Sequence, residues 1–169
     1  GNIKKLMQSQ KKYLFKTVIT QPVKKNKKII SSTMIRKLLK RGKIEKVNNL
    51  LKREWSVYGK VIKGERRGRK LGFPTCNIDL KNYTTPRFGV YAVKVKIDKV
   101  LKKGIANVGY RPTFNGKKLL LEVNIFNFKR NLYNKKINVI FNKFIRPEKK
   151  FKNILQLKNQ IKKDIRLAK

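Results

Sequence analysis

Residues 91–98 read YAVKVKID, and apolar side chains occupy every second position from Tyr91 to Ile97. Successive side chains of a strand point to opposite faces, so this alternation predicts a strand with one buried and one wet face. Similar patterns mark further candidate strands, the last of them weaker: residues 55–61, 119–125, 137–141 and 101–108. Several short strands of this kind favour an antiparallel sheet.

Turn signals separate these strands: Gly64, Gly68, Gly72, Pro86 and the pair Asn115-Gly116. The Asn-Gly pair favours a tight hairpin, so we expect it to join Phe114 to a strand over 117–126. Near the C-terminus, apolar residues at helical spacing from Ile154 to Ile165 predict an amphipathic helix over about 152–168. Strands followed by one such helix predict a mainly β fold, a small antiparallel barrel with a C-terminal helix packed against it.

The first part of the chain has a different pattern. Residues 12–19 predict a short strand, and residues 20–30 predict a lysine-rich loop. Ser31-Ser32-Thr33 offers a helix N-cap, and Gly42 is a plausible stop for that helix. Residues 44–51 fit a second short helix.

Residues 1–52 are too few for a core of their own, and the sequence lacks an initiating Met. We therefore expect them to be the end of a larger domain, with residues 53–169 forming a second domain. No apolar run approaches the ~20 residues of a membrane span, and the start does not resemble a signal peptide. The single cysteine, Cys76, excludes an intramolecular disulfide and a cysteine-cluster metal site. These features predict a cytoplasmic protein.

The charge is extreme, with 47 Lys and Arg against 8 Asp and Glu and a formal net charge of +39. Such a chain attracts polyanions, so nucleic acid, anionic membrane and phosphorylated small molecules are all candidate partners. The lysines are spread along the whole length, however, and Lys, Asn and Ile share A/T-rich codons. Compositional drift would therefore give the same charge to a protein of any function.

Histidine is absent, which excludes histidine-based acid–base catalysis and histidine-bound metals. An enzyme that uses a carboxylate base must take it from a short set: Asp79, Asp98, Asp164, Glu45, Glu54, Glu65, Glu122 and Glu148.

Residues 64–77 read GERRGRKLGFPTCN, in which three glycines at four-residue spacing enclose four cations. Glycines let the backbone approach a ligand, and successive amides can cradle phosphate oxygens. The spacing is not that of a Walker A loop, and a solvated hairpin loop would explain the same residues. Thr75 and Asn77 follow Pro74 at a spacing that places them on one face of a strand. Their hydroxyl and amide oxygens are hard ligands suited to magnesium.

Residues 68–77 resemble the signature of riboflavin kinases, in which proline, threonine, alanine and asparagine are usual and Cys76 here replaces the alanine. Further motifs of that family follow in the expected order: GVYAV at 89–93, GIANVG at 104–109, RPTF at 111–114, LEV at 121–123, LY at 132–133, RPE at 146–148 and the helix with Gln160, Ile161 and Asp164. The resemblance covers essentially all of residues 55–169. It implies a six-stranded, Greek-key-like barrel, the kinase part of a bifunctional riboflavin kinase/FAD synthetase.

The resemblance also implies the reaction, ATP-dependent phosphorylation of the riboflavin 5′-hydroxyl to FMN with Mg²⁺. Glu122 would be the general base, and Thr75 and Asn77 would hold the metal. The ATP phosphates would be bound by the loop and the residues after it: Gly64, Gly68, Arg69, Lys70, Gly72, Thr75 and Asn77. The flavin ring needs a slot, expected near the barrel mouth and capped by the last helix. Asp79 and Glu65 compete as bases, and a surface glutamate on an edge strand is the plain alternative for Glu122.

The chain departs from the family at four asparagines. Relatives often carry histidine at the position of Asn124, aspartate at the positions of Asn127 and Asn131, and glycine at the position of Asn134. The residues expected at the reaction centre are untouched, so these changes bear on flavin affinity and turn geometry.

Residues 30–36, ISSTMIR, resemble a late nucleotidyltransferase motif of the synthetase half, in which Ser31, Ser32, Thr33 and Arg36 would contact phosphates. An ordinary capped helix explains them as well. The synthetase's histidine-containing motif is absent, so we expect no FAD synthesis by this chain alone. Two alternatives stay open: a non-enzymatic basic barrel that binds nucleic acid and a degenerate kinase. Non-specific polyanion binding is expected rather than a specific nucleic-acid partner, and the sequence leaves the oligomeric state open.

Overall fold

The computed structural model describes residues 2–25, 28–65, 67–113 and 116–169, and the chain divides into two compact units, Gly1–Ile30 and Ser31–Lys169. This division differs from the domain boundary expected after residue 52. The assignment of residues 1–52 to a synthetase remnant stays a prediction.

The first unit contains a helix and a minimal hairpin. α1 (Ile3–Tyr13) begins after Asn2, whose side chain accepts a hydrogen bond from the Lys5 amide at 3.2 Å. β1 (Lys24–Lys25) pairs antiparallel with β2 (Lys28–Ile29), in the stretch expected to be a lysine-rich loop. No residue of α1 is buried within the described part of the chain.

The strand predicted over residues 12–19 is wrong. The capped helix runs on to Tyr13, and Leu14 ends it in the left-handed conformation with φ of 51°. Among the described residues, 15–19 pair with no other strand. An extended segment without a hydrogen-bonded neighbour is not a stable strand, whatever its apolar content.

The second unit begins with the two predicted helices, α2 (Ser32–Lys40) and α3 (Ile44–Leu51). The Ser31 hydroxyl caps α2 by accepting a hydrogen bond from the Met34 amide at 3.2 Å, as the sequence predicts. Gly42 allows the sharp turn between the helices because its φ of 71° disfavours other residues.

α2 and α3 belong to the core of the second unit. Leu39, Ile44 and Val47 are buried in the same cluster as the barrel side chains. The Asn48 side chain donates to the Phe141 carbonyl at 3.0 Å and accepts from the Trp55 amide at 2.7 Å. These contacts join the helices to the sheet, so they are structural parts of this unit.

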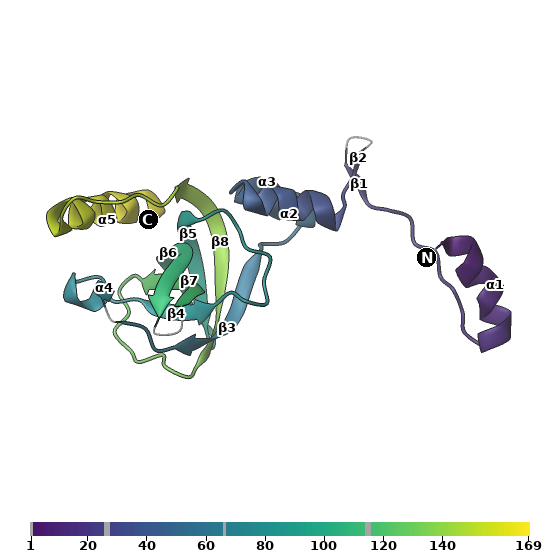
Figure 1. The fold of residues 1–169 in the computed structure, drawn as a ribbon, viewed down its shortest axis with the longest axis horizontal. Coiled ribbons are helices and arrows are strands. Elements are labelled where there is room, and N and C mark those ends of the chain that lie inside the picture. The colour runs from purple at the N-terminus through teal and green to yellow at the C-terminus, as the bar shows by residue number, and fades with distance from the viewer. Residues whose placement is uncertain (1, 26–27, 66, 114–115) are drawn as a thin grey trace. The chain divides into compact units, whose positions relative to one another are not determined.

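The predicted barrel is confirmed (Figure 1). Its strands are β3 (Ser56–Ile62), β4 (Cys76–Asp79), β5 (Gly89–Ile97), β6 (Val100–Thr113), β7 (Gly116–Ile125) and β8 (Lys136–Arg146). All neighbouring strands are antiparallel, and the closed order is β3-β4-β7-β6-β5-β8. Closure leaves no free sheet edge.

Alternation along the strands separates the barrel interior from its outer face. Leu121 and Val123 of β7 are buried in the core cluster. Phe141 of β8 packs against Trp55 in a tilted arrangement and against Tyr91 edge to face, at centroid distances of 4.8 and 5.0 Å. The residues between the inward positions, such as Glu122, therefore point outward. The interior is a packed apolar core, so a ligand site must lie outside it.

Two helices lie on one side of this barrel in Figure 1: the single turn α4 (Arg67–Lys70) and the C-terminal α5 (Ile154–Ala168). α5 begins after its N-cap Asn153 and packs against β5, β6 and β8, which confirms the predicted helix. β6 and β7 form the predicted hairpin, with Thr113 opposite Gly116. Its turn residues, Phe114 and Asn115, lie outside the described residues.

Candidate active site

A row of three polar side chains crosses the outer face of the sheet. Asn77 of β4 lies opposite Glu122 of β7, and Glu122 lies opposite Asn107 of β6. Their neighbours along each strand are apolar and mostly buried. Polar residues aligned on otherwise apolar strands indicate a site built by the sheet itself.

This row forms part of the wall of a cavity of about 1190 Å³ between the sheet and α5. The apolar wall includes Val90, Ile105 and Leu120 on the strands and Phe151, Leu157 and Ile161 beside or on the helix. Charged side chains also line it: Lys63, Glu65, Arg111, Lys118, Glu122, Arg146, Glu148, Lys149 and Asp164. The cavity thus offers an apolar surface for a flat ring and cations for an anionic group.

The cavity opens on the outer face of the barrel. From the sequence, the flavin slot was expected near the barrel mouth instead. Val90, Ile105 and Leu120 are buried, yet they do not belong to the core cluster. They are therefore buried on the outer face of the sheet, where α5 and the segment before it cover the strands. The expected role of the last helix as a cover agrees with this placement.

Asn77 carries a buried oxygen that lacks a partner. Its side chain is 6% exposed, and Oδ1 makes no hydrogen bond within the described part of the chain. A buried polar atom without a partner is costly and needs an explanation, and an absent ligand atom is a common one. Thr75 lines the same cavity two residues earlier. An amide oxygen and a hydroxyl are donors of the kind that a hard divalent cation prefers.

Gly64 lets the loop after β3 pack against the Asn77 side chain, and Gly68 lets the loop pack against the Phe73 backbone. A Cβ at Gly64 would lie 1.8 Å from Nδ2 of Asn77, and one at Gly68 would lie 2.5 Å from the Phe73 carbonyl oxygen. A side chain at Gly68 would collide with backbone, so glycine is required there, whereas a side chain at Gly64 would force the Asn77 side chain to shift.

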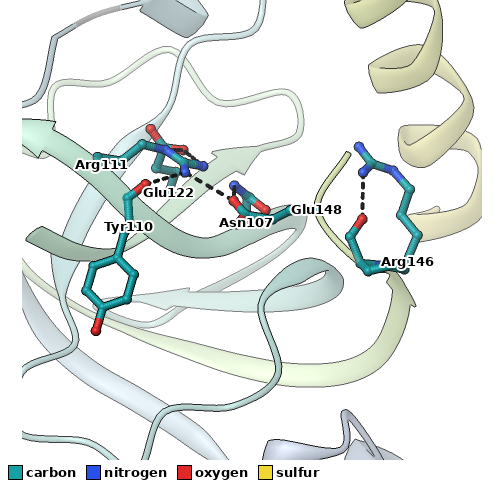
Figure 2. A network of polar contacts seen from close by, with 7 residues as sticks. Asn107, Tyr110, Arg111, Glu122, Arg146 and Glu148 are labelled. Carbon is teal, nitrogen blue, oxygen red and sulfur yellow. Dashed lines mark hydrogen bonds and ion pairs between the residues drawn. The ribbon is translucent and has the colours of Figure 1, made fainter. Parts of the chain in front are cut away.

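Glu122 is bound to an arginine from the neighbouring strand (Figure 2). Nε and one terminal nitrogen of Arg111 contact Oε2 of Glu122 at 2.8 and 2.7 Å. The other terminal nitrogen contacts Oε1 of Glu148 at 3.1 Å, and Nδ2 of Asn107 donates to that oxygen at 3.3 Å. Burial lowers the pKa of Arg111, but the hydrogen bonds and charges of both glutamates outweigh it and raise the pKa above its ordinary value. Arg111 therefore stays charged.

A second ion pair fixes α5 to the barrel. Asp164 is 2% exposed, and its two carboxylate oxygens share the Nε–H of Arg146, each at 3.0 Å, while Oδ2 also accepts from a terminal nitrogen of Arg146 at 2.7 Å. Gln160 donates to the same carboxylate at 2.8 Å. A buried charge needs partners of this kind, and here they join β8 to the helix.

The structure brings together part of the predicted set. The cavity wall contains Gly64, Gly68, Thr75, Asn77 and Glu122. It does not contain the remaining predicted loop residues, Arg69, Lys70 and Gly72. The loop contains two other arginines, Arg66 and Arg67, and Arg66 lies outside the described residues. The roles of all these residues in binding and catalysis stay predictions.

The competing carboxylates differ in position. Glu65 lines the cavity, whereas Asp79 does not. Asp79 pairs with Lys118 at 3.0 Å and accepts a hydrogen bond from the Lys81 amide at 2.9 Å. Burial raises the pKa of Asp79, but that amide and the Lys118 ammonium outweigh it, so the pKa lies below its ordinary value. Asp79 is thus a paired carboxylate at the margin of the site.

The residues of the N-terminal motif are not in the cavity wall, which contains none of Ser31, Ser32, Thr33 and Arg36. Ser31 acts as a helix cap. Their nucleotidyltransferase role stays a prediction.

The asparagines that depart from the family fit their positions. Asn127 and Asn134 have φ of 52° and 65°, a conformation that asparagine tolerates better than most residues. Nδ2 of Asn124 donates to the Pro74 carbonyl at 2.7 Å, which ties β7 to the start of β4. The Asn131 side chain accepts from the Tyr133 amide at 3.0 Å.

Sequence reasoning assigned no partner to several residues of the site, and it considered the last two only as members of the carboxylate set: Asn107, Arg111, Arg146, Glu148 and Asp164. Each lies inside a family motif, but its partner is far away in the sequence, and pairing in space depends on strand register. One local signal existed: Asn107 interrupts the apolar run at 105–108.

The fold and the cavity define a class: a small closed antiparallel barrel whose ligand site lies between the outer face of the sheet and a C-terminal helix. The chain belongs to the riboflavin kinase family, whose model matches residues 51–169. That family uses ATP and typically a divalent metal.

The relatives agree with this assignment. A bifunctional riboflavin kinase/FMN adenylyltransferase of Buchnera aphidicola subsp. Schizaphis graminum is 47% identical over 173 residues, which cover 100% of this chain and 55% of the relative. The protein of the same name in Bacillus subtilis is 41% identical and covers 88% of this chain and 48% of its own length. The chain thus spans about half the length of the curated relatives it matches.

A solved structure supports the fold. The crystal structure described as a macrolide-efflux protein from Streptococcus pneumoniae matches with a TM-score of 0.80 and 36% identity, over 89% of this chain and 50% of that one. In the described residues, no helix is both long and apolar enough to cross a membrane.

Proposed function

We propose that this chain phosphorylates riboflavin at its 5′-hydroxyl, using ATP and a divalent metal, and releases FMN and ADP. One observation carries the proposal: the cavity holds Glu122 directly opposite Asn77, whose buried Oδ1 has no partner in the described chain. Acting as metal ligand and base, these two residues would lie side by side on adjacent strands, where both could serve one phosphoryl transfer.

Glu122 accepts the proton of the 5′-hydroxyl as that oxygen attacks the γ-phosphorus of ATP. The new P–O bond forms on riboflavin, and the bond from the γ-phosphorus to the ADP oxygen breaks. Glu122 suits this role because it is partly buried, lies in the cavity wall and has its carboxylate held by Arg111. A positioned base of this kind contributes about 10²–10⁴-fold in rate.

Asn77 and Thr75 would hold the metal, taken here as Mg²⁺. A divalent metal held there would supply charge neutralisation for the ATP phosphates. The loop lies against Asn77 at Gly64, so its backbone would lie near the ATP phosphates. Lys63 and Lys118 line the cavity and are additional cations for the phosphate chain.

Riboflavin would place its ring in the apolar part of the cavity, between the strands and α5. Ile105 and Leu120 form one wall, and Leu157 and Ile161 form the other. Burial of a planar apolar ring there excludes water and orients the ribityl chain towards Glu122. FAD synthesis is not part of the proposal.

The test is FMN formation by the purified chain from riboflavin, ATP and Mg²⁺, separated by chromatography and detected by fluorescence. Glu122→Gln keeps the shape of the side chain but removes the base, so we expect kcat to fall about 10²–10⁴-fold. Glu54→Gln removes a surface carboxylate outside the cavity and serves as the matched control. Undetectable FMN from the folded parent would contradict the proposal, as would full activity in Glu122→Gln.

A further inference from the structure

We propose that Arg111 is a positioning residue, which holds the Glu122 carboxylate for the reaction and couples it to Glu148 on the segment beside the cavity. The inference rests on the proposed function, in which Glu122 is the base.

Both contacts from Arg111 to Glu122 fall on one oxygen. Nε lies 2.8 Å and a terminal nitrogen 2.7 Å from Oε2. The terminal torsion of a glutamate is otherwise broad, so two charge-assisted hydrogen bonds on a single oxygen fix its rotation. Oε1 receives no hydrogen bond from the described side chains and is the oxygen left for the substrate hydroxyl.

Arg111 is itself fixed. Its other terminal nitrogen donates to the Tyr110 carbonyl at 2.8 Å and to Oε1 of Glu148 at 3.1 Å. Figure 2 shows the guanidinium group between these acceptors and Glu122. All three of its nitrogens are therefore engaged, a geometry that the planar fork of arginine allows and a lysine ammonium does not.

The Glu148 carboxylate lies over Gly109 of β6. A Cβ at Gly109 would lie 2.3 Å from Oε1 of Glu148, so the carboxylate occupies the place of the missing side chain. Asn107 and Arg111, two residues before and after Gly109 on the same face of β6, both contact that oxygen. Gly109 thus leaves space for the Glu148 carboxylate, and hydrogen-bond donors lie on both sides of it. An isolated ion pair on the surface has neither feature.

Glu148 lies between β8 and α5, in the segment whose Lys149 and Phe151 line the cavity. Arg111 therefore connects this segment to the base. A ligand that orders the segment also holds Arg111, and through it Glu122, in place.

The experiment compares kcat and KM for riboflavin and ATP in Arg111→Gln, Arg111→Lys and Glu148→Gln. Lys96→Gln is the control, because it removes one positive charge from exposed β5 surface outside the cavity. We expect Arg111→Gln to lower kcat about 10–100-fold, part of what a positioned base supplies, with a change in KM for ATP of less than about threefold. Arg111→Lys should recover part of that loss, and Glu148→Gln should lower kcat several-fold.

A double variant separates positioning from a general structural effect. In the Glu122→Gln background, Arg111→Gln should cause little further loss, because two residues that act as a unit are not additive. An equal loss in both backgrounds would overturn the proposal, as would unchanged kcat in Arg111→Gln or a rise confined to KM for ATP. Thermal melts verify folding. If Arg111→Gln does not fold, Glu148→Gln decides the matter, and full activity there overturns the coupling.

The parent measured alone keeps the two proposals apart. If the folded, unmutated chain forms no FMN, the proposed function is refuted without any measurement on the Arg111 variants. An active parent that loses activity in Glu122→Gln but not in Arg111→Gln refutes this inference alone.

Discussion

At the scale of single residues, a few atoms decide the site. Asn77 supplies a buried oxygen, Glu122 supplies a carboxylate, and Gly64 lets the loop pack against Asn77. The sequence predicted these residues because they lie in local motifs. It could not assign Arg111 or Glu148, because their meeting depends on the register of β6 with β7 and on the path of the chain after β8.

Cys76 gives a prediction at this scale. Burial raises the pKa of its thiol to about 12, which a backbone hydrogen bond offsets in part. The raised pKa means that the folded protein disfavours the thiolate, the form that reacts with alkylating agents. At pH 8 we expect the thiol to react about a thousandfold more slowly in the folded protein than in denaturant. Iodoacetamide labelling followed by mass spectrometry measures both rates, and comparable rates would contradict the burial of this thiol.

At the scale of elements, the alternating stretches were predicted well because a half-buried strand leaves a period of two in the sequence. The helices α2, α3 and α5 were predicted for the equivalent reason, since a helix with one buried face leaves a helical period of apolar residues. The strand expected over 12–19 failed because strand formation depends on a neighbour, which local pattern does not report. The short β4 was predicted only through the spacing of Thr75 and Asn77, since four residues are too few to show a period.

The docking of α5 yields a second prediction. Asp164→Asn leaves Arg146 without its buried partner, and breaking such a pair costs about 3–5 kcal/mol. Glu54→Gln breaks the exposed pair with Lys94 and should cost less than about 1 kcal/mol. Because α5 forms one wall of the cavity, Asp164→Asn should also raise KM for riboflavin more than KM for ATP. Denaturant melts and steady-state kinetics test this, and equal stability losses in the two variants would contradict it.

At the scale of the whole molecule, the formal charge of +39 dominates. Positively charged side chains at this density repel one another and destabilise the compact state, and salt screens that repulsion. We expect the melting temperature to rise from low to moderate salt, by about 2–4 °C for each kcal/mol of relieved repulsion. Scanning calorimetry in a sodium chloride series measures it. A melting temperature that falls over that range would show that attractive pairs outweigh the repulsion.

The same charge bears on the nucleic-acid alternative. Non-specific phosphate contacts weaken steeply with salt, so RNA binding should be lost at moderate ionic strength while kinase activity persists. The charge is therefore compatible with the enzyme proposal and does not by itself define a function.

Transfer of the γ-phosphate of ATP to riboflavin is the most direct test of the central claim. With γ-labelled ATP, riboflavin and Mg²⁺, we expect the label to appear in FMN, little of it to appear as inorganic phosphate, and Glu122→Gln to slow the transfer about 10²–10⁴-fold. Label found only as inorganic phosphate, or no release of label by a folded chain, would contradict the claim.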